Sequence, residues 1–356
     1  MSEHPLVSAE AGANLAVVAH AARDVRVDVL PEPDPAPDEA IIEIAYGGIC
    51  GSDLHYWLEG AAGASMLREP MVLGHEVVGT VRTAAADGSS PPVGTAVAVH
   101  PNTPHPLGDI RWPADKPHLA PGACYLGSAA HLPHTQGAFA RRIALPARML
   151  RALPPGLDLQ TAALAEPAAV AWHALERAGS VEGRSVLVVG GGPIGLLCVA
   201  VAKHHGASRV ILSDLAEAPR RRAQKLGADQ VIDAADRAAL DSLDVDVVLE
   251  ASGTVPGLAS AINAAVRGGV VVMVGLQRQG EVMVPMATAI SRELDLRGAL
   301  RFNQEIDQVL PALADGSLDV RGIVTHTFAV TNVLQGLRTA RDSEESGKVL
   351  IDFRTG

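Results

Sequence analysis

Two kinds of hydrophobic pattern divide the chain. Residues 1–155 hold short apolar runs bounded by glycine and proline, which is the pattern of β-strands separated by turns. Val25–Leu30 predicts one such strand, and prolines at every second position from Pro31 to Pro37 continue it as an extended segment. This part of the chain is therefore expected to be mainly β and barrel-like, with further strands at Ala40–Ala45, Val77–Val81, Ala96–His100 and Phe139–Leu145.

The pattern changes near Gln160. Thr161–Ala178 is rich in Ala and Leu and predicts a helix that Pro167 interrupts. Beyond it, short apolar strands alternate with helical segments, which indicates βαβ units and a parallel sheet. A last strand, Val349–Phe353, could rejoin the first domain. The other predicted strands are Ser185–Val189, Val210–Leu212, Val231–Ile232, Val245–Leu249 and Val270–Val274, with helices over Leu196–His204 and Pro219–Leu226.

Composition and charge exclude several classes of partner. The 356 residues carry a formal net charge of −11 and contain no long basic run, so nucleic acid is not expected to bind. We expect neither a membrane span nor a signal peptide, because no long uncharged apolar stretch and no basic N-terminal region occur. The three cysteines, Cys50, Cys124 and Cys198, make no disulfide framework, and a cytoplasmic location is the natural expectation.

A glycine-rich turn follows the predicted strand Ser185–Val189. Gly190, Gly192 and Gly195 have the spacing G-x-G-x-x-G and open a predicted helix, which is the arrangement that binds the pyrophosphate of a dinucleotide. The helix N-terminus then offers free N–H groups to the phosphates. By itself the run could be only a tight turn, but its position between strand and helix favours the nucleotide site.

Asp214 ends the next strand, 19 residues after Gly195. A carboxylate at this place accepts both hydroxyls of the adenosine ribose and repels a 2′-phosphate, so NAD is favoured over NADP. The cluster Arg220–Arg222 is better interpreted as a solvated helix face, although its charge could soften that preference.

A possible metal site lies in the first domain. Cys50, His75 and Glu76 offer a thiolate, an imidazole and a carboxylate within 26 residues, which is a ligand set that catalytic zinc takes while keeping one position open. Cys50 alone would more often be a buried small hydrophobe. Ser52 could accept the proton of a bound alcohol and His55 could pass it to solvent, and we expect Asp53 to orient the imidazole of His75.

These motifs together resemble the zinc-containing medium-chain dehydrogenase/reductase family. The resemblance covers nearly the whole chain, and within the family it favours the polyol branch, similar to sorbitol dehydrogenases and nearest to the enzymes that oxidise L-idonate. The segments that carry it are GICGSDLHYW from Gly48, GHEVVG from Gly74, LAEPAAVAWHA from Leu164, GGGPIG from Gly190, and Gly347-Lys348-Val349; Leu126–Ala129, His131–His134 and Leu296–Phe302 favour the idonate enzymes.

The resemblance implies a fold and further site residues. Residues 1–158 and 297–356 would form a GroES-like β-barrel catalytic domain, and residues 159–296 a Rossmann domain with a doubly wound parallel sheet. Glu166 would lie near the zinc or ligate it, whereas Tyr56, Arg301 and Phe302 would line the substrate pocket. Further cofactor contacts are expected from Pro193, Ile194, Ser252 and Gly275.

The sequence departs from the family pattern in a lobe of the first domain and also at Pro219, where relatives often carry an Arg near the adenosine ribose. Many relatives bind a second, structural zinc in that lobe through four closely spaced cysteines. In this chain the lobe spans residues 105–127, and Cys124 is its only cysteine. His105, Asp109 and His118 make a poor structural site without thiolates. We therefore predict one catalytic zinc per chain and no structural zinc.

The predicted function is a zinc-dependent oxidation of a secondary alcohol of a sugar acid or polyol by NAD. The favoured reaction is the oxidation of L-idonate to 5-ketogluconate. Sorbitol or xylitol, 2,3-butanediol and threonine are the alternative substrates. In the expected mechanism, a cleft between the two domains brings alcohol and nicotinamide together. A non-catalytic nucleotide-binding protein and a zinc-free quinone reductase are the more distant alternatives. The resemblance also implies a homodimer or homotetramer.

Overall fold

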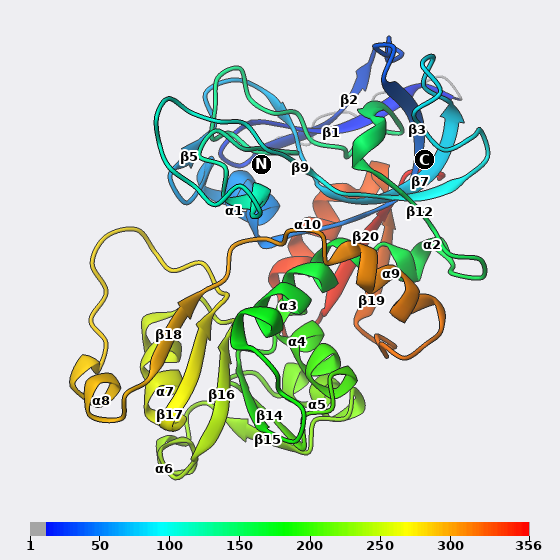
Figure 1. Cartoon of the computed structure of the whole chain (residues 1–356). Coiled ribbons are helices and arrows are strands. Elements are labelled where there is room, and N and C mark those ends of the chain that lie inside the picture. The colour runs from blue at the N-terminus through cyan, green and yellow to red at the C-terminus, as the bar shows by residue number, and fades with distance from the viewer. Residues whose placement is uncertain (1–11, 356) are drawn as a thin grey trace. The chain divides into compact units, whose positions relative to one another are not determined.

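The computed structural model describes residues 12–355 and divides them into two compact units (Figure 1). Unit 1 takes residues up to Glu166 together with His326–Arg341 and Lys348 onward. Unit 2 takes Pro167–Thr325 and Asp342–Gly347. The final strand returns to unit 1.

Unit 1 is built on β-sheets. Its main sheet has the strand order β12-β8-β7-β3-β20-β19, with β11 paired to β3, and a second sheet has the order β2-β1-β6. An isolated bridge between Ala16 and Ala140 links β1 to the chain before β11. The strands are β1 (Asn14–Ala21), β2 (Asp24–Leu30), β3 (Glu39–Gly48), β6 (Met71–Val72), β7 (Glu76–Thr83), β8 (Ala96–Val99), β11 (Arg142–Pro146), β12 (Leu150–Ala152), β19 (Val324–Ala329) and β20 (Lys348–Asp352).

Short elements connect these strands. Two two-stranded ribbons, β4 with β5 and β9 with β10, lie outside the main sheets. Their bounds and those of the helices are β4 (Ala61–Ala62), β5 (Ser65–Met66), β9 (Asn102–Thr103), β10 (Cys124–Tyr125), α1 (Gly51–Glu59), α2 (Leu159–Ala162), α10 (Val333–Arg341) and the 3₁₀ turns η1 (Pro117–Leu119), η2 (Ala147–Met149) and η3 (Val330–Asn332).

Apolar side chains from both sheets of unit 1 meet in one core. Val17 and Ile42 are fully buried there, and Phe139 packs against Phe353 from the C-terminal segment. Burial of this kind provides the main stabilisation, about 25 cal/mol per Å² of apolar surface. The C-terminal strand β20 is therefore part of the unit 1 core, in agreement with the prediction that this strand rejoins the first domain.

Unit 2 holds a parallel six-stranded sheet with the order β15-β14-β13-β16-β17-β18. The strand order reverses between β13 and β16, which is where such sheets bind dinucleotides. The strands are β13 (Ser185–Val189), β14 (Arg209–Asp214), β15 (Gln230–Asp233), β16 (Val245–Glu250), β17 (Ala265–Met273) and β18 (Asp295–Gly298).

Helices pack on this sheet. α4 and α5 contact β14, and α7 contacts β16 and β17 (Figure 1). None of the helices in residues 12–355 has the length and hydropathy needed to span a membrane. The helices are α3 (Ala165–Ala178), α4 (Pro193–His204), α5 (Glu217–Lys225), α6 (Arg237–Asp241), α7 (Val255–Ala264), α8 (Met286–Ser291) and α9 (Ile306–Ala314).

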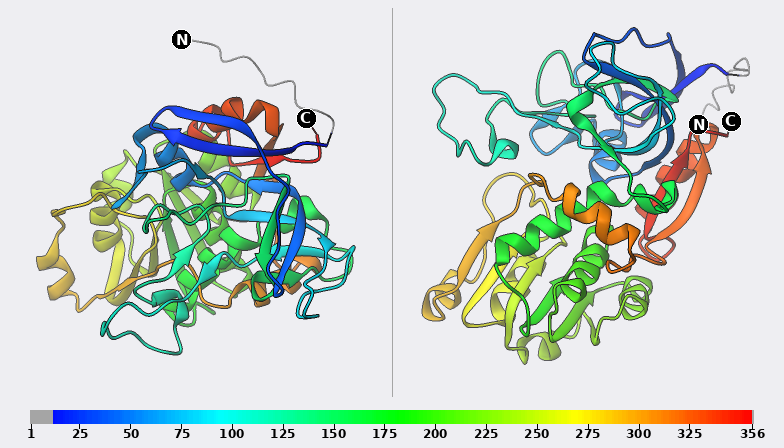
Figure 2. Two further views of the ribbon diagram at one scale, coloured as in Figure 1. Left: turned by 90° about the horizontal axis from the view of Figure 1, so that it is seen from above. Right: turned by 45° about the vertical axis from the view of Figure 1, so that its right-hand side comes forward.

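Residues 297–325 pack with unit 2, which differs from the predicted domain boundary at residue 297. Figure 2 shows α9 (orange) beside α3 (green). Trp172 on α3 donates from its indole nitrogen to Gln308 on α9, and His173 bonds Glu305 directly before α9. These contacts between side chains more than 130 residues apart tie α9 to unit 2, and a local pattern of hydrophobic residues carries no sign of them.

Candidate active site

Cys50, His75 and Glu76 lie together in unit 1. Cys50 directly precedes α1, His75 directly precedes β7, and Glu76 is the first residue of β7. One potential ligand atom from each of the three lies within 4.8 Å of the others. Gly74 forms the turn before His75 with φ +88°, and a Cβ there would lie 1.9 Å from the ring of Phe139, so only glycine fits.

Asp53 joins the two segments that carry these side chains. Its buried carboxylate accepts the backbone N–H of Cys50 at 2.9 Å and that of Gly74 at 3.1 Å. The prediction that Asp53 orients the imidazole of His75 is wrong in this structure: Nδ1 of His75 is buried and has no hydrogen-bond partner among the described residues. Asp53 acts on the main chain instead, and burial raises the pKa of its carboxyl.

The electrostatics of the group fit a divalent cation. Burial lowers the pKa of His75, but the Cys50 thiolate, the Glu166 carboxylate and Asp53 outweigh it, so the pKa is raised to about 10. A strongly held proton on a buried imidazole shows how much negative charge surrounds it. A thiolate, a carboxylate and an imidazole with an unpartnered nitrogen form a donor set suited to zinc.

Lys348 neutralises one of these candidate ligands. Its Nζ, on β20, lies 2.7 and 2.6 Å from the two carboxylate oxygens of Glu76 and donates to the carbonyl of Ile49 at 3.1 Å. Both charged side chains are buried. The sequence places Lys348 in a recognisable segment but gives no sign of this pairing, because 272 residues separate it from Glu76.

Glu166 lies beside the group but is not one of its three mutually close ligands. It is buried in the first turn of α3 and accepts a hydrogen bond from the hydroxyl of Tyr125 at 2.5 Å. Burial raises the pKa of Glu166 to about 7, although His75, Tyr125 and Lys348 act in the opposite direction. Tyr125 is a site residue that sequence reasoning missed.

The predicted nucleotide-binding residues gather at the carboxyl ends of β13, β16 and β17. A Cβ on Gly190 would lie 2.8 Å from the Cα of Ser252, and one on Gly275 would lie 2.2 Å from the nitrogen of Gly253. A Cβ on Gly195 would lie 1.8 Å from the carbonyl oxygen of Gly190. Glycine is therefore required where these loops and the start of α4 approach one another.

The start of α4 has the form expected for an anion site. Gly192 is the N-cap in extended conformation, Pro193 is the first helical residue, and Ile194 follows, so N–H groups of the first turn are left for a ligand. The hydroxyl of Ser252 bonds the buried carboxylate of Glu250, which also accepts the N–H of Gly253. Glu250 thereby orders the loop after β16.

Asp214 ends β14, and its carboxylate is placed by two backbone donors. Gly191 donates to Oδ2 at 2.6 Å and Ala216 donates to Oδ1 at 2.8 Å. Arg220 bonds the carbonyl of Asp214 and lies 3.2 Å from Asp233. The carboxylate of Asp214 therefore lies beside the glycine turn. The guanidinium of Arg220 already contacts oxygen atoms of the protein.

Comparisons with known proteins agree with this geometry. Residues 36–155 match the family model described as alcohol dehydrogenase GroES-like domain, and residues 193–315 match the model described as zinc-binding dehydrogenase. Sorbitol dehydrogenase from Gallus gallus is 34% identical over 345 residues, covering 94% of this chain and 96% of its own. L-idonate 5-dehydrogenase (NAD(P)(+)) from Escherichia coli is 33% identical over 320 residues, covering 88% and 91%. The chain belongs to the zinc-containing medium-chain dehydrogenase family.

A solved structure supports the same assignment. The crystal structure of L-idonate 5-dehydrogenase from Escherichia coli matches with a TM-score of 0.89 and 31% identity, over 96% of this chain and 98% of that one. The predicted combination of a GroES-like domain and a Rossmann sheet is thereby confirmed, as is the prediction of a zinc-type alcohol dehydrogenase.

The predicted proton relay of this dehydrogenase lies on α1. Ser52 is half-buried in the first turn, and His55 is exposed and 3.4 Å from Glu59. Tyr56, in contrast, is buried, and its hydroxyl accepts the N–H of Ala129 at 2.9 Å. Ser52 and His55 thus keep part of their surface in contact with solvent, whereas Tyr56 ties α1 to the 126–129 segment.

Arg301 and Phe302 belong to unit 2. Arg301 has φ 52°, an uncommon conformation for a residue with a side chain, and Phe302 is only 1% exposed. The backbone N–H of Asn303 bonds Glu305, which fixes the chain directly after them. Their role toward substrate stays a prediction.

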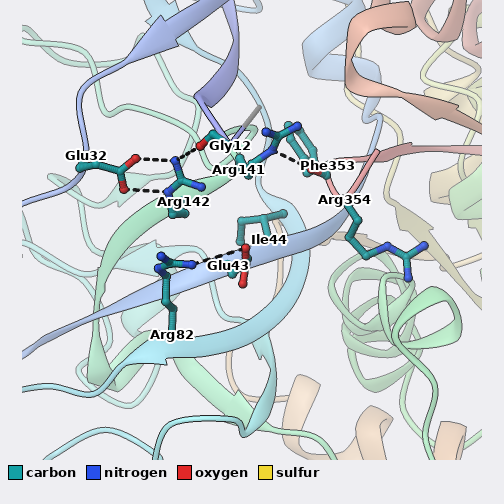
Figure 3. A pocket seen from close by; sticks show the side chains of 9 residues that line it. All are labelled: Gly12, Glu32, Glu43, Ile44, Arg82, Arg141, Arg142, Phe353 and Arg354. Carbon is teal, nitrogen blue, oxygen red and sulfur yellow. Dashed lines mark hydrogen bonds and ion pairs between the residues drawn. The ribbon is translucent and has the colours of Figure 1, made fainter. Parts of the chain in front are cut away.

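A separate cleft of about 590 Å³ in unit 1 is lined by charged residues (Figure 3). Its arginines are already engaged: Arg142 pairs with Glu32, Arg82 with Glu43, and Arg141 donates to the carbonyl of Phe353. None of the predicted catalytic or metal-binding side chains lines this cleft.

Proposed function

We propose that this dehydrogenase oxidises a secondary hydroxyl of a sugar acid with NAD, and that L-idonate, giving 5-ketogluconate, is its substrate. The observation that carries the proposal is the group of half-buried Cys50 with buried His75 and Glu76, in a chain whose second unit holds a complete dinucleotide fingerprint. Its similarity to the idonate enzyme in both sequence and fold supports this choice of substrate.

Cys50, His75 and Glu76 would hold one zinc ion. Bound there, zinc acts as a Lewis acid that lowers the pKa of a hydroxyl group toward neutrality. Glu166, held by Tyr125, would orient water or substrate beside the ligands. The lobe over residues 105–127 has Cys124 as its only thiol, which supports a single zinc per chain.

The residues of α1 would move the proton. Ser52 would accept it from the alcohol, and His55, about one helical turn further along the exposed side of α1, would deliver it to water. The nicotinamide, when bound, would supply the acceptor that takes the carbon-bound hydrogen with its electron pair as hydride. One ketone, one reduced cofactor and one proton are formed for each alcohol consumed.

Unit 2 would select and hold the cofactor. The N–H groups at the start of α4 would bind the pyrophosphate, with Gly192 allowing its close approach and Gly190 and Gly195 allowing the close packing of the turn. Asp214 would accept the adenosine ribose hydroxyls and disfavour a 2′-phosphate, which supports NAD over NADP. Ser252 and Gly275 would border the nicotinamide half of the site.

Arg301, Tyr56 and Phe302 would shape the substrate pocket. Arg301 carries the charge that a sugar acid needs, because a guanidinium binds a carboxylate through two parallel hydrogen bonds. Tyr56 still has a proton to donate, since its contact with Ala129 uses only the oxygen lone pair.

The test is turnover of purified protein with L-idonate, gluconate, sorbitol, xylitol and 2,3-butanediol, each with NAD⁺ and NADP⁺, followed by absorbance of the reduced cofactor. We expect the highest kcat/KM for L-idonate with NAD⁺. Turnover confined to neutral diols would overturn the assignment of a sugar acid.

A neutral polyol is the second candidate, because sorbitol dehydrogenase from Gallus gallus is 34% identical to the chain. Sorbitol or xylitol turnover exceeding that of idonate would favour it. The homodimer or homotetramer and the cytoplasmic location also remain predictions.

A further inference from the structure

Tyr125 links the cysteine-poor lobe to the active site. It lies on β10, whose pairing with β9 sets Tyr125 opposite Asn102. The side chain is buried, and its ring meets the imidazole of His75 edge-on, with 5.4 Å between ring centroids and 64° between planes. The same side chain donates its hydroxyl proton to Oε1 of Glu166 at 2.5 Å. Tyr125 therefore contacts both a ligand and the carboxylate beside the ligands.

The two glutamates of the site have different anchors. Glu76 is held by Lys348 at both carboxylate oxygens. Glu166 is bonded by Tyr125 at Oε1, although Lys348 and His75 also act on its charge. A hydrogen bond to a carboxylate fixes its rotation and withdraws electron density from the bonded oxygen.

Glu166 has the chemistry of a fourth ligand but does not join the three. Cys50, His75 and Glu76 bring their ligand atoms within 4.8 Å of one another, and Glu166 is not in that group. A buried carboxylate beside a divalent cation would be expected to bind it unless another contact restrains it. The Tyr125 hydroxyl is the restraint that the structure provides.

We propose that Tyr125 is a positioning residue whose hydroxyl holds Glu166 outside the coordination sphere of the metal bound by Cys50, His75 and Glu76. The inference rests on the proposed function, since it requires zinc at these ligands. It assigns to the cysteine-poor lobe a part in the catalytic site: the lobe supplies the group that keeps the open metal position free for substrate.

The experiment compares Tyr125→Phe with wild type and with Tyr46→Phe. Tyr46 is a matched control, because its hydroxyl also bonds a charged side chain of unit 1, that of Arg354, away from the ligands. Zinc affinity is measured by chelator competition on the purified full chain without substrate. Cobalt-substituted protein is examined for its visible d–d spectrum, which reports the metal's ligand set.

Tyr125→Phe should bind zinc about ten-fold more tightly, which is the usual size of an affinity change when a group beside the ligands is altered. It should also change the cobalt spectrum. In a Glu166→Gln background the same substitution should change neither. Tyr46→Phe should behave as wild type.

An unchanged affinity and spectrum in Tyr125→Phe would overturn the inference, as would an equal change with and without Glu166. Weaker zinc binding in Tyr125→Phe would overturn it too. These results differ from failure of the proposed function, in which wild type itself would bind no zinc or oxidise no sugar acid or polyol.

Discussion

Lys348 donates to both carboxylate oxygens of Glu76, at 2.7 and 2.6 Å, and the two side chains are 2% and 1% exposed. The pair joins β20, near the end of the chain, to the first residue of β7. Removing one member of a buried ion pair leaves an uncompensated charge, which costs about 3–5 kcal/mol. The pair therefore fixes the carboxylate of a candidate metal ligand through a contact with β20.

Lys348→Met is expected to lower the stability of unit 1 by about 3–5 kcal/mol. Glu76→Gln added to it should recover most of the loss, because the unpaired charge is then gone. Thermal unfolding of metal-free protein measures both effects. Lys225→Met, on the exposed surface of α5, is the control and should change little. Equal melting temperatures for Lys348→Met and the control would contradict the expectation.

Cys50→Ala should lose zinc and reduce turnover by about 10³-fold or more, since a metal Lewis acid contributes several kcal/mol to the transition state. Binding of NADH, followed by fluorescence, should persist because the nucleotide fingerprint lies in unit 2. Cys124→Ser should keep both zinc and turnover. Two tightly bound zinc ions in wild type, by metal analysis, would show that the single-zinc prediction fails.

Asp214→Ala should weaken NAD⁺ by about ten-fold or more, because hydrogen bonds to a charged acceptor contribute about 1.5–3 kcal/mol. NADP⁺ should be affected less, so the ratio of the two kcat/KM values falls. Asp233→Ala is matched, since Asp233 ends the neighbouring strand in register with Asp214. If the ratio stays constant in Asp214→Ala, the residue is not the selector.

Arg301→Ala should raise KM for L-idonate more than for sorbitol, because only the sugar acid offers a carboxylate to the guanidinium. A rise of about ten-fold in the ratio of the two KM values is the expected size for a lost charged hydrogen bond. Arg278→Ala, exposed on the loop after β17, serves as control. Equal effects on both substrates would mean that Arg301 does not read the carboxylate.

Glu305→Gln should lower the melting temperature at pH 7, and the difference from wild type should vanish in acid. Burial opposes ionisation of Glu305, but the hydrogen bond to His173 outweighs it, so the pKa is held below its ordinary value of 4.5. A depressed pKa contributes stability above the ordinary pKa, and this is lost as pH falls through the depressed value. Melting curves of wild type and Glu305→Gln between pH 7 and pH 3 measure this loss. A difference in melting temperature that does not change with pH would contradict a stabilising role for the Glu305–His173 pair.

The positions of strands and the nucleotide turn followed closely from the sequence. The predicted strand Ser185–Val189 is β13 with the same bounds, and Gly190 follows it as expected. The helix predicted over Thr161–Ala178 is instead two helices, α2 and α3, separated at Ala163–Leu164. Pro167 does not interrupt α3. It lies in the first turn of this helix, where a proline is accommodated.

The sequence also determined which chemistry to expect, since Cys50, His75 and Glu76 carry recognisable donor types at short separation, and Asp214 stands at a fixed distance from the glycine turn. Local spacing contains this information because each candidate ligand lies at the boundary of a helix or strand: Cys50 precedes α1, His75 precedes β7 and Glu76 begins it. Tertiary structure alone decided the partners of those groups. Lys348 reaches Glu76, Tyr125 reaches Glu166, and Asp53 bonds main chain instead of His75. These contacts join groups that lie 21 to 272 residues apart in the sequence, and no local pattern encodes which of them the folded sheets bring together.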